Sequence, residues 1–108
     1  MMKEKLLERI KYFGIKQQKR KFGEEADELK EAIAEYETLK TYVGGAKMGQ
    51  LKNHIAEEIA DNLAMLKQFQ LFYEISNEEI KEWLNFKNER TDKKIKNGEY
   101  KKGEDFFE

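Results

Sequence analysis

Apolar residues recur three and four positions apart along most of this chain, and no proline interrupts them. Such spacing places apolar side chains on one face of an α-helix. A chain without proline can also form long helices without a forced kink. The pattern predicts four helices, over residues 3–13, 15–43, 50–73 and 77–95. An all-α fold follows, and helices of this length suit a four-helix bundle.

Glycine and capping residues mark the ends of these helices. Gly14 ends the first helix, and the stretch 44–49, with its three glycines, predicts the turn between the second and third. Ser76 and Glu79 have the spacing of a capping box at the start of the fourth helix. Asn97-Gly98 is a typical helix end.

At 108 residues the chain has the length of one domain. We expect a single all-α domain over residues 1–98, followed by a polar C-terminal tail over residues 99–108. Gly23 falls inside the second predicted helix, where glycine is costly. It is either a tolerated glycine or a point at which another helix or a substrate comes close.

Charged residues make up 40% of the chain, yet the formal net charge is only -1. Such a balance gives no overall field that attracts nucleic acid, so we expect no nucleic-acid partner. The absence of cysteine excludes disulfides, zinc-thiolate sites and thiol nucleophiles. No apolar run reaches the roughly 18 residues of a membrane span, and the start of the chain is too charged for a signal peptide. We therefore expect a cytoplasmic protein without a membrane partner.

Two acidic signatures lie on the second and third predicted helices, at residues 24–28 and 57–61. Residues three apart share one side of a helix. A projection at about 100° per residue places four of these acids beside an apolar face: Glu25, Glu28, Glu58 and Asp61. If the two helices pack side by side, four carboxylates converge, and a hard divalent cation makes such a cluster tolerable. The remaining acids, Glu24, Asp27 and Glu57, are interpreted as bystanders. The same projection puts Asn62 within the apolar stripe, where it needs a hydrogen-bond partner.

A chain this rich in charge can also carry such signatures as solvated faces, whose acids pair with basic residues four positions on. The residues at that spacing from the inward-facing acids are not basic: Leu29 after Glu25, Asn62 after Glu58 and Met65 after Asp61. Acids at the edge of a core without basic partners favour a metal site over a solvated face.

The two signatures resemble the motif of the MazG-like all-α nucleoside triphosphate pyrophosphohydrolases, EExxE followed some tens of residues later by ExxD. Here the first motif is residues 24–28 and the second is residues 58–61, with 29 residues between them. Phe13-Gly14 and Gln18 precede the first motif, and Asn62-Leu63 continue the second, as expected for the family. The resemblance covers about residues 10–100.

The resemblance implies hydrolysis of a nucleoside or deoxynucleoside triphosphate to the monophosphate and pyrophosphate, with Mg²⁺ as cofactor and Mn²⁺ as its substitute. It assigns Glu25, Glu28, Glu58 and Asp61 to the metal, and one of them to the attacking water. These four are therefore the predicted catalytic and metal-binding residues. The resemblance also implies a homodimer or homotetramer of four-helix protomers.

Four acids would repel a triphosphate unless cations lie nearby. Lys87, Arg90 and Lys94 share the side of the fourth helix that carries Trp83, and the segment resembles the basic C-terminal segment of family members. We predict that these residues and Gln18 bind the substrate, with Trp83 stacking on a base. The alternatives are a solvated basic helix end that complements the helix dipole, and a tryptophan that belongs to the core.

Two other functions fit the same residues. One is a non-catalytic helical interaction module, in which the acids bind only counterions. The other is a related pyrophosphohydrolase that acts on a phosphoribosyl-nucleotide.

Overall fold

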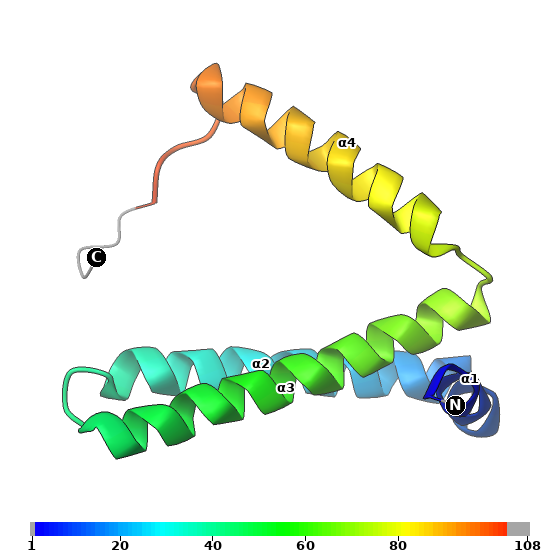
Figure 1. Ribbon diagram of the computed structural model, residues 1–108, viewed down its shortest axis with the longest axis horizontal. Coiled ribbons are helices and arrows are strands. Elements are labelled where there is room, and N and C mark those ends of the chain that lie inside the picture. The colour runs from blue at the N-terminus through cyan, green and yellow to red at the C-terminus, as the bar shows by residue number, and fades with distance from the viewer. Residues whose placement is uncertain (1, 104–108) are drawn as a thin grey trace. The chain divides into compact units, whose positions relative to one another are not determined.

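The computed structural model describes residues 2–103, and over this range it contains four α-helices and no strand (Figure 1). The helices are α1 (Met2–Phe13), α2 (Ile15–Leu39), α3 (Gly45–Phe72) and α4 (Asn77–Lys96). The predicted all-α class is confirmed. The chain divides into two compact units, residues 1–74 and 75–108, and each unit is described by itself. The single domain over residues 1–98 stays a prediction.

Two predicted helix boundaries are wrong, and both lie at the glycine-rich turn. α2 ends at Leu39, four residues before the predicted end, and α3 begins at Gly45, five residues before the predicted start. The amide of Met48 donates a hydrogen bond to the carbonyl oxygen of Gly44 at 3.0 Å, which begins the helical pattern of α3. A glycine inside a helix costs only about 1 kcal/mol relative to alanine, so Gly49 lies in the helix rather than ending it.

The other predicted helix ends are confirmed. Gly14, between α1 and α2, has a φ of 88°, a left-handed conformation that glycine adopts without strain. At the start of α4, the amide of Glu79 donates to the Ser76 hydroxyl and the amide of Ser76 donates to the Glu79 carboxylate, both at 3.1 Å. This is the predicted capping box. Gly98, with a φ of 73°, follows the end of α4.

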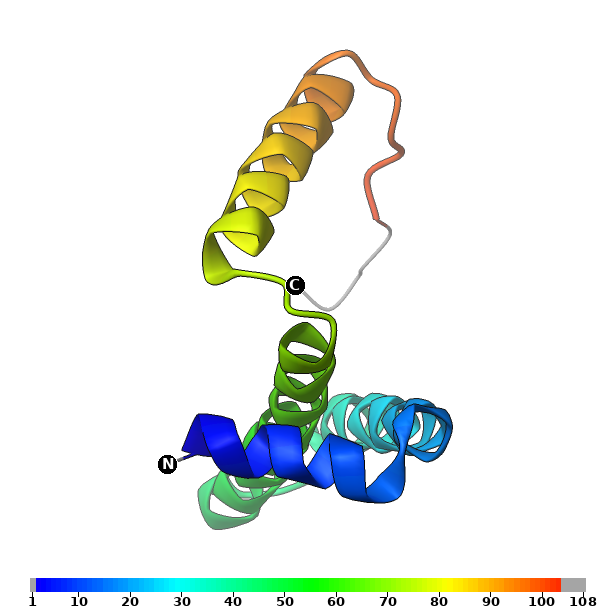
Figure 2. The same cartoon turned by 90° about the vertical axis from the view of Figure 1, so that its right-hand side faces the viewer.

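In the first unit, α2 and α3 lie antiparallel, side by side, and α1 contacts both of them (Figure 1). Figure 2 shows α1 lying across this pair. The buried apolar residues are few for a unit of this length: Leu6, Ile10, Ala32, Leu51 and Met65.

The buried faces of α2 and α3 follow a spacing that alternates between four and three residues, as in coiled coils. At this spacing lie Gln18, Phe22, Glu25, Leu29, Ala32 and Tyr36 on α2, and Leu51, Ile55, Glu58, Asn62, Met65 and Phe69 on α3. All of them are buried or half-buried, and we call them the α2–α3 seam. Several seam positions are polar, so the core of this unit is only partly hydrophobic.

Part of the predicted apolar stripes is wrong. The helical spacing of apolar residues predicts stripes on the second and third helices that include five residues which the structure leaves exposed: Ile33, Ile59, Leu63, Leu66 and Tyr73. α3 carries apolar residues on two faces. Only the face that also carries Glu58 and Asn62 is turned towards α2. The other face is only partly covered within this unit, and its residue Leu63 lines a hollow together with Leu6 of α1.

The second unit contains α4, none of whose residues is buried. Residues 99–103 that follow α4 are exposed and not helical, and the rest of the predicted tail, residues 104–108, lies outside the described residues. Nowhere in residues 2–103 is there a helix long and apolar enough to cross a membrane.

Gly23 provides a test of the packing around α2. A Cβ placed at Gly23 would meet no atom of the described residues within 4 Å, so neither α1 nor α3 comes close to it. Gly23→Ala should therefore raise the free energy of unfolding by up to about 1 kcal/mol, because alanine loses less backbone entropy on forming a helix. A denaturant titration measures this change. The matched control is Gly14→Ala, which should lower the free energy of unfolding because Gly14 has a positive φ; a gain of stability there would contradict the backbone assignment.

Candidate functional site

Glu25, Glu58 and Asp61 come together where α2 and α3 meet. Each residue offers one carboxylate oxygen, and these three oxygens lie within 4.8 Å of one another. Glu25 and Glu58 are only 5% and 6% exposed, whereas Asp61 is exposed. We call these three residues the acid cluster. Three of the four predicted metal ligands are thus neighbours in space.

Two of these acids are more deeply placed than the helical projection predicted. The projection put Glu25 and Glu58 at the border of the apolar stripes, but both occupy positions of the α2–α3 seam. Because the seam runs through the middle of the helix contact, the neighbouring helix covers their side chains. The cluster therefore has a buried floor, formed by two glutamates, and an exposed edge at Asp61.

Asn62 links the two helices at the level of the acid cluster. Its side-chain nitrogen Nδ2 donates to the carbonyl oxygen of Glu25 at 3.0 Å and to that of Glu58 at 2.8 Å. The first of these bonds joins α3 to α2, and the second lies within α3. The prediction that Asn62 is buried and needs a partner is confirmed.

Two buried carboxylate oxygens have no such partner. Oε2 of Glu25 and Oε2 of Glu58 are buried, and no hydrogen-bond donor reaches either of them in the part of the chain that the structure describes. Leaving a buried polar group unpaired costs about 1–3 kcal/mol, and more when the group is charged. Both oxygens belong to the acid cluster, so a cation bound there would compensate them.

Glu25 has one basic partner, and the prediction that it has none is wrong. Nζ of Lys21 lies 2.9 Å from Oε1 of Glu25, and the hydrogen bond to Glu25 raises the pKa of the Lys21 ammonium group. The sequence argument examined only the position four residues after each acid, whereas Lys21 lies four residues before Glu25. Lys21 is therefore a candidate functional residue that the sequence analysis missed, although its four-residue spacing from Glu25 is evident in the sequence.

Glu28, the fourth predicted ligand, is exposed and lies on α2. Its carboxylate is not among the three that lie within 4.8 Å of one another. The negative charge of Glu25 nevertheless raises the pKa of the Glu28 carboxyl above its ordinary value, and the charge of Glu58 adds to this effect. Glu28 is thus close enough to the acid cluster for the charges of Glu25 and Glu58 to raise the pKa of its carboxyl group.

A pocket of about 410 Å³ lies beside Lys21. Its lining residues come from α2, α3 and the end of α1: Phe13, Gln17, Gln18, Arg20, Lys21, Glu24, Met65 and Gln68. Nε2 of Gln18 donates to Oε1 of Gln68 at 2.8 Å, which fixes two polar side chains in the wall. The predicted substrate-binding residue Gln18 therefore lines a pocket that also offers two cations, Arg20 and Lys21.

The other predicted substrate-binding residues, Trp83, Lys87, Arg90 and Lys94, lie on α4 in the second unit. Trp83 is 62% exposed and is not a core residue of this unit. Its ring meets that of Phe86 edge to face at 5.8 Å, and the Arg90 guanidinium lies 5.8 Å from the centre of the same Phe86 ring. Nζ of Lys94 lies 5.7 Å from the centre of the Tyr100 ring.

The acids interpreted as bystanders, Glu24, Asp27 and Glu57, are all exposed.

The residues of the acid cluster supply only carboxylate oxygens, the donors that Mg²⁺ and similar hard cations prefer. Two buried oxygens and an exposed carboxylate would hold such an ion from one side and leave its other side to water or to an anion. The residues present therefore fit a hard divalent cation.

No family model, curated protein or solved structure matches this chain. Its function has to be inferred from the chemistry of the acid cluster and from the motif resemblance.

The raised pKa of Glu28 predicts how the metal-free protein depends on pH. Its ordinary pKa is 4.5, and the folded protein holds the proton more tightly than the unfolded chain does. The stability that Glu28 contributes is therefore present below that value and is lost as pH rises through the raised pKa. Glu28→Gln should thus be more stable than the wild type at pH 7 without divalent cations, and the difference should vanish towards pH 4.

Chemical denaturation in a chelating buffer at several pH values measures this difference. Glu31→Gln, an exposed substitution on the same helix, is the matched control and should show no such pH-dependent gain. If Glu28→Gln were no more stable than the wild type at neutral pH, Glu28 would lie outside the field of the acid cluster.

Proposed function

We propose that the protein is a Mg²⁺-dependent pyrophosphohydrolase that cleaves a nucleoside or deoxynucleoside triphosphate into the monophosphate and pyrophosphate. The observation that carries the proposal is the pair of buried, unpartnered carboxylate oxygens of Glu25 and Glu58 within the acid cluster. A structural role alone does not explain why two glutamates are buried with one carboxylate oxygen each left without a hydrogen-bond donor. The motif resemblance supplies the reaction type.

In this proposal, Glu25, Glu58 and Asp61 hold the cation, and Glu28 contributes from the exposed side. When bound by these residues, Mg²⁺, or Mn²⁺ in its place, would make the attacking water more acidic and would neutralise charge on phosphate oxygens. One carboxylate of the site orients the attacking water and accepts its proton. The water oxygen forms a bond to the α- or β-phosphorus as the anhydride bond between these two atoms breaks. The bridging oxygen leaves with the phosphate that was not attacked, and the products are the monophosphate and pyrophosphate.

Lys21 has a role in this proposal that follows from its position. In the metal-free protein its ammonium group neutralises part of the charge of Glu25. When a divalent cation shares the Glu25 carboxylate, the ammonium group becomes available to a phosphate in the adjoining pocket, where Arg20 and Gln18 also lie. The cations needed to admit a triphosphate are then present beside the acids themselves.

The family resemblance extends the proposal in three respects. It places the chain in a four-helix protomer of the MazG-like type, it makes the protein a homodimer or homotetramer, and it gives Lys87, Arg90 and Lys94 of α4 contacts with the substrate. Stacking of Trp83 on a base is a separate prediction from its place on the same side of the helix. Each of these stays a prediction from the sequence.

A helical interaction module is the second candidate function. It is favoured by the Lys21–Glu25 ion pair, which already compensates one acid, and by the exposed apolar residues of α3 and α4. In such a module the acid cluster would bind counterions without turnover. A phosphoribosyl-nucleotide is the alternative substrate within the same reaction type.

Metal binding can be tested without any substrate. At a free Mg²⁺ concentration 100 times the dissociation constant, binding to the folded state alone should raise the free energy of unfolding by about 2.7 kcal/mol. Glu58→Gln removes one ligand and one buried charge, so it should lose most of this gain. Thermal or denaturant unfolding with and without Mg²⁺ or Mn²⁺ gives the measurement.

Glu57→Gln is the matched control, because Glu57 is the exposed neighbour of Glu58 and should leave the metal effect intact. A wild-type protein that neither Mg²⁺ nor Mn²⁺ stabilises would rule out the metal site. Equal loss of the effect in both variants would point to nonspecific binding by surface charge.

Turnover is tested by pyrophosphate release from a panel of ribo- and deoxyribonucleoside triphosphates, with a phosphoribosyl-nucleotide included. We expect release from at least one triphosphate in Mg²⁺, and a loss in Glu58→Gln of at least about 10- to 100-fold, the effect typical of residues that only support metal ligands. Glu57→Gln should retain activity. Metal-dependent stabilisation without turnover of any compound would favour the interaction module instead.

A further inference from the structure

A hollow of about 830 Å³ lies between α1 and α3 of the first unit. On each helix its lining residues are spaced i, i+3, i+4 and i+7, the spacing of one helical face, within residues 2–9 of α1 and 60–67 of α3. Each wall is therefore about 10 Å long, or about two helical turns. Because α1 lies across the pair formed by α2 and α3 (Figure 2), only these short stretches of the two helices face the hollow.

The floor of this hollow is apolar. Leu6 on α1 is only 6% exposed, whereas Leu63 on α3 is 60% exposed, so the hollow has a deep side and an open side. Ala60 and Ala64 lie one turn apart on α3 and keep the wall between them low. An apolar chain lying in the hollow would remove Leu63 from water.

The charged side chains around this floor all have one sign. Among the described residues, three cations and no acid line the hollow: Lys5, Arg9 and Lys67. The whole chain has 22 acids and 21 lysines and arginines, so the hollow is a local excess of positive charge. Neither Lys5 nor Arg9 forms an ion pair with any acid of residues 2–103.

The positions of Lys5 and Arg9 favour an anion between them. The two residues lie four apart on one face of α1, where like charges destabilise a helix. They also lie in the first turns of α1, towards the end at which the helix dipole attracts negative charge. A negative group beside both side chains would relieve the repulsion and gain from the dipole.

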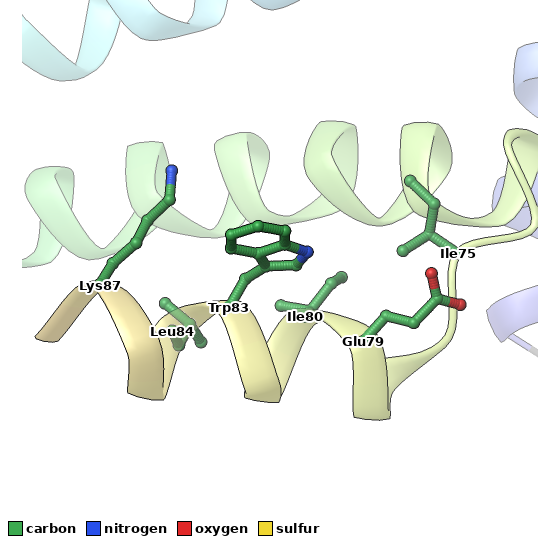
Figure 3. A pocket seen from close by; sticks show the side chains of 6 residues that line it. All are labelled: Ile75, Glu79, Ile80, Trp83, Leu84 and Lys87. Atoms are coloured by element: carbon green, nitrogen blue, oxygen red, sulfur yellow. The ribbon is translucent and has the colours of Figure 1, made fainter. Parts of the chain in front are cut away.

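The hollow on α4, of about 570 Å³, is also largely apolar but differs in its charges. Figure 3 shows Glu79 and Lys87 towards opposite ends of the row that Ile80, Trp83 and Leu84 form. One acid and one cation do not select a ligand by the sign of its charge. The hollow between α1 and α3 is therefore the one of the two that selects an anion.

The dimensions of the α1–α3 hollow favour a small molecule over a macromolecule. Its volume of about 830 Å³ lies within the range of roughly 300–1,000 Å³ typical of small-molecule sites, which are mostly apolar with a few polar groups. Walls of two turns are short for a protein partner, since a standard interface takes about 800 Å² from each side. A flat bilayer would contact the exposed rim but not the nearly covered Leu6. A single apolar chain with a charged end can reach both.

We propose that this hollow binds an anionic amphiphile, a small molecule with one carboxylate or similar anionic group on an unbranched apolar chain of medium length. The chain lies against Leu6, Leu63 and the two alanines, and the anionic group lies between Lys5 and Arg9. Lys67 adds positive charge from the α3 side. The site contains no residue of the acid cluster, and the proposal does not rest on the proposed enzymatic function.

Decanoate is the probe, added to the full chain at neutral pH below the concentration at which it forms micelles. The amide NMR signals of residues 2–9 and 60–67 should shift saturably, with a dissociation constant of about 0.1–1 mM, as expected from the usual affinity per ligand atom. Octanoate should bind about fourfold more weakly, because it lacks two methylenes that would lie half in contact with the protein. Acetate and decyltrimethylammonium should not shift these signals at the same concentrations, since one lacks the chain and the other carries the opposite charge.

Two variants test the residues, and all their substitutions are at exposed positions outside the proposed catalytic and binding machinery. Lys5→Gln/Arg9→Gln removes two charges and should weaken decanoate binding about fivefold. Leu63→Gln removes apolar surface from the open side and should also weaken it. The matched control, Lys3→Gln/Lys11→Gln, removes two charges from α1 outside the hollow and should keep the dissociation constant within about twofold of the wild type, because exposed distant charges are screened. Circular dichroism of each variant checks that helix content is retained.

Three results would overturn the proposal: signal shifts confined to other residues, equal binding of decanoate and decyltrimethylammonium, or equal weakening in the two double variants. Co-sedimentation with phosphatidylglycerol vesicles, without shifts caused by decanoate, would replace the amphiphile by a membrane surface. Signals of residues 2–9 and 60–67 that move with protein concentration but not with decanoate would assign the hollow to a contact between copies, and would overturn the proposal as well.

Discussion

The two hydrogen bonds donated by the Asn62 side chain hold the candidate site together. One nitrogen is bonded to the carbonyl of Glu25 on α2 and to the carbonyl of Glu58 on α3, at the level where the two carboxylates would otherwise push the helices apart. A shift of either helix by one residue along the seam would break the bond between them. A single buried amide can thus specify the register of two helices, much as a buried asparagine does in a coiled coil.

The first unit gives up hydrophobic stability to build this arrangement. Its buried polar residues are as many as its five buried apolar ones: Gln18, Glu25, Glu58, Asn62 and Gln68. The two amides of the glutamines bond to each other, and Asn62 bonds to the backbone, so the glutamates alone carry buried oxygens without a partner. Departures from polar satisfaction tend to occur where a protein binds something. The pattern of satisfied amides around unsatisfied acids marks the candidate site on the seam.

The sequence was sufficient to predict the helices and all three residues of the acid cluster. Helical spacing, capping residues and the order of two motifs are local features of a sequence. It did not predict which face of α3 is buried. Apolar residues lie on two faces of that helix, and the buried one includes Glu58 and Asn62, which a search for apolar stripes passes over. The start of α3 at Gly45 was missed because the glycines were interpreted as a turn. A glycine inside a helix costs only about 1 kcal/mol relative to alanine, which the rest of a long helix can offset. Lys21 was missed because basic partners were sought only after each acid, and an ion pair on a helix can form in either direction.

The ion pair between Lys21 and Glu25 also gives the folded chain a tethered competitor for its own anionic site. An ammonium group attached one helical turn away keeps the same local concentration however dilute the protein is. A monovalent ion that displaced it would exchange one unit charge for another and gain little, whereas a divalent ion brings twice the charge to the same carboxylates. At the proposed metal site, the spacing of two residues on α2 would therefore discriminate between ions by their charge, without a shaped cavity.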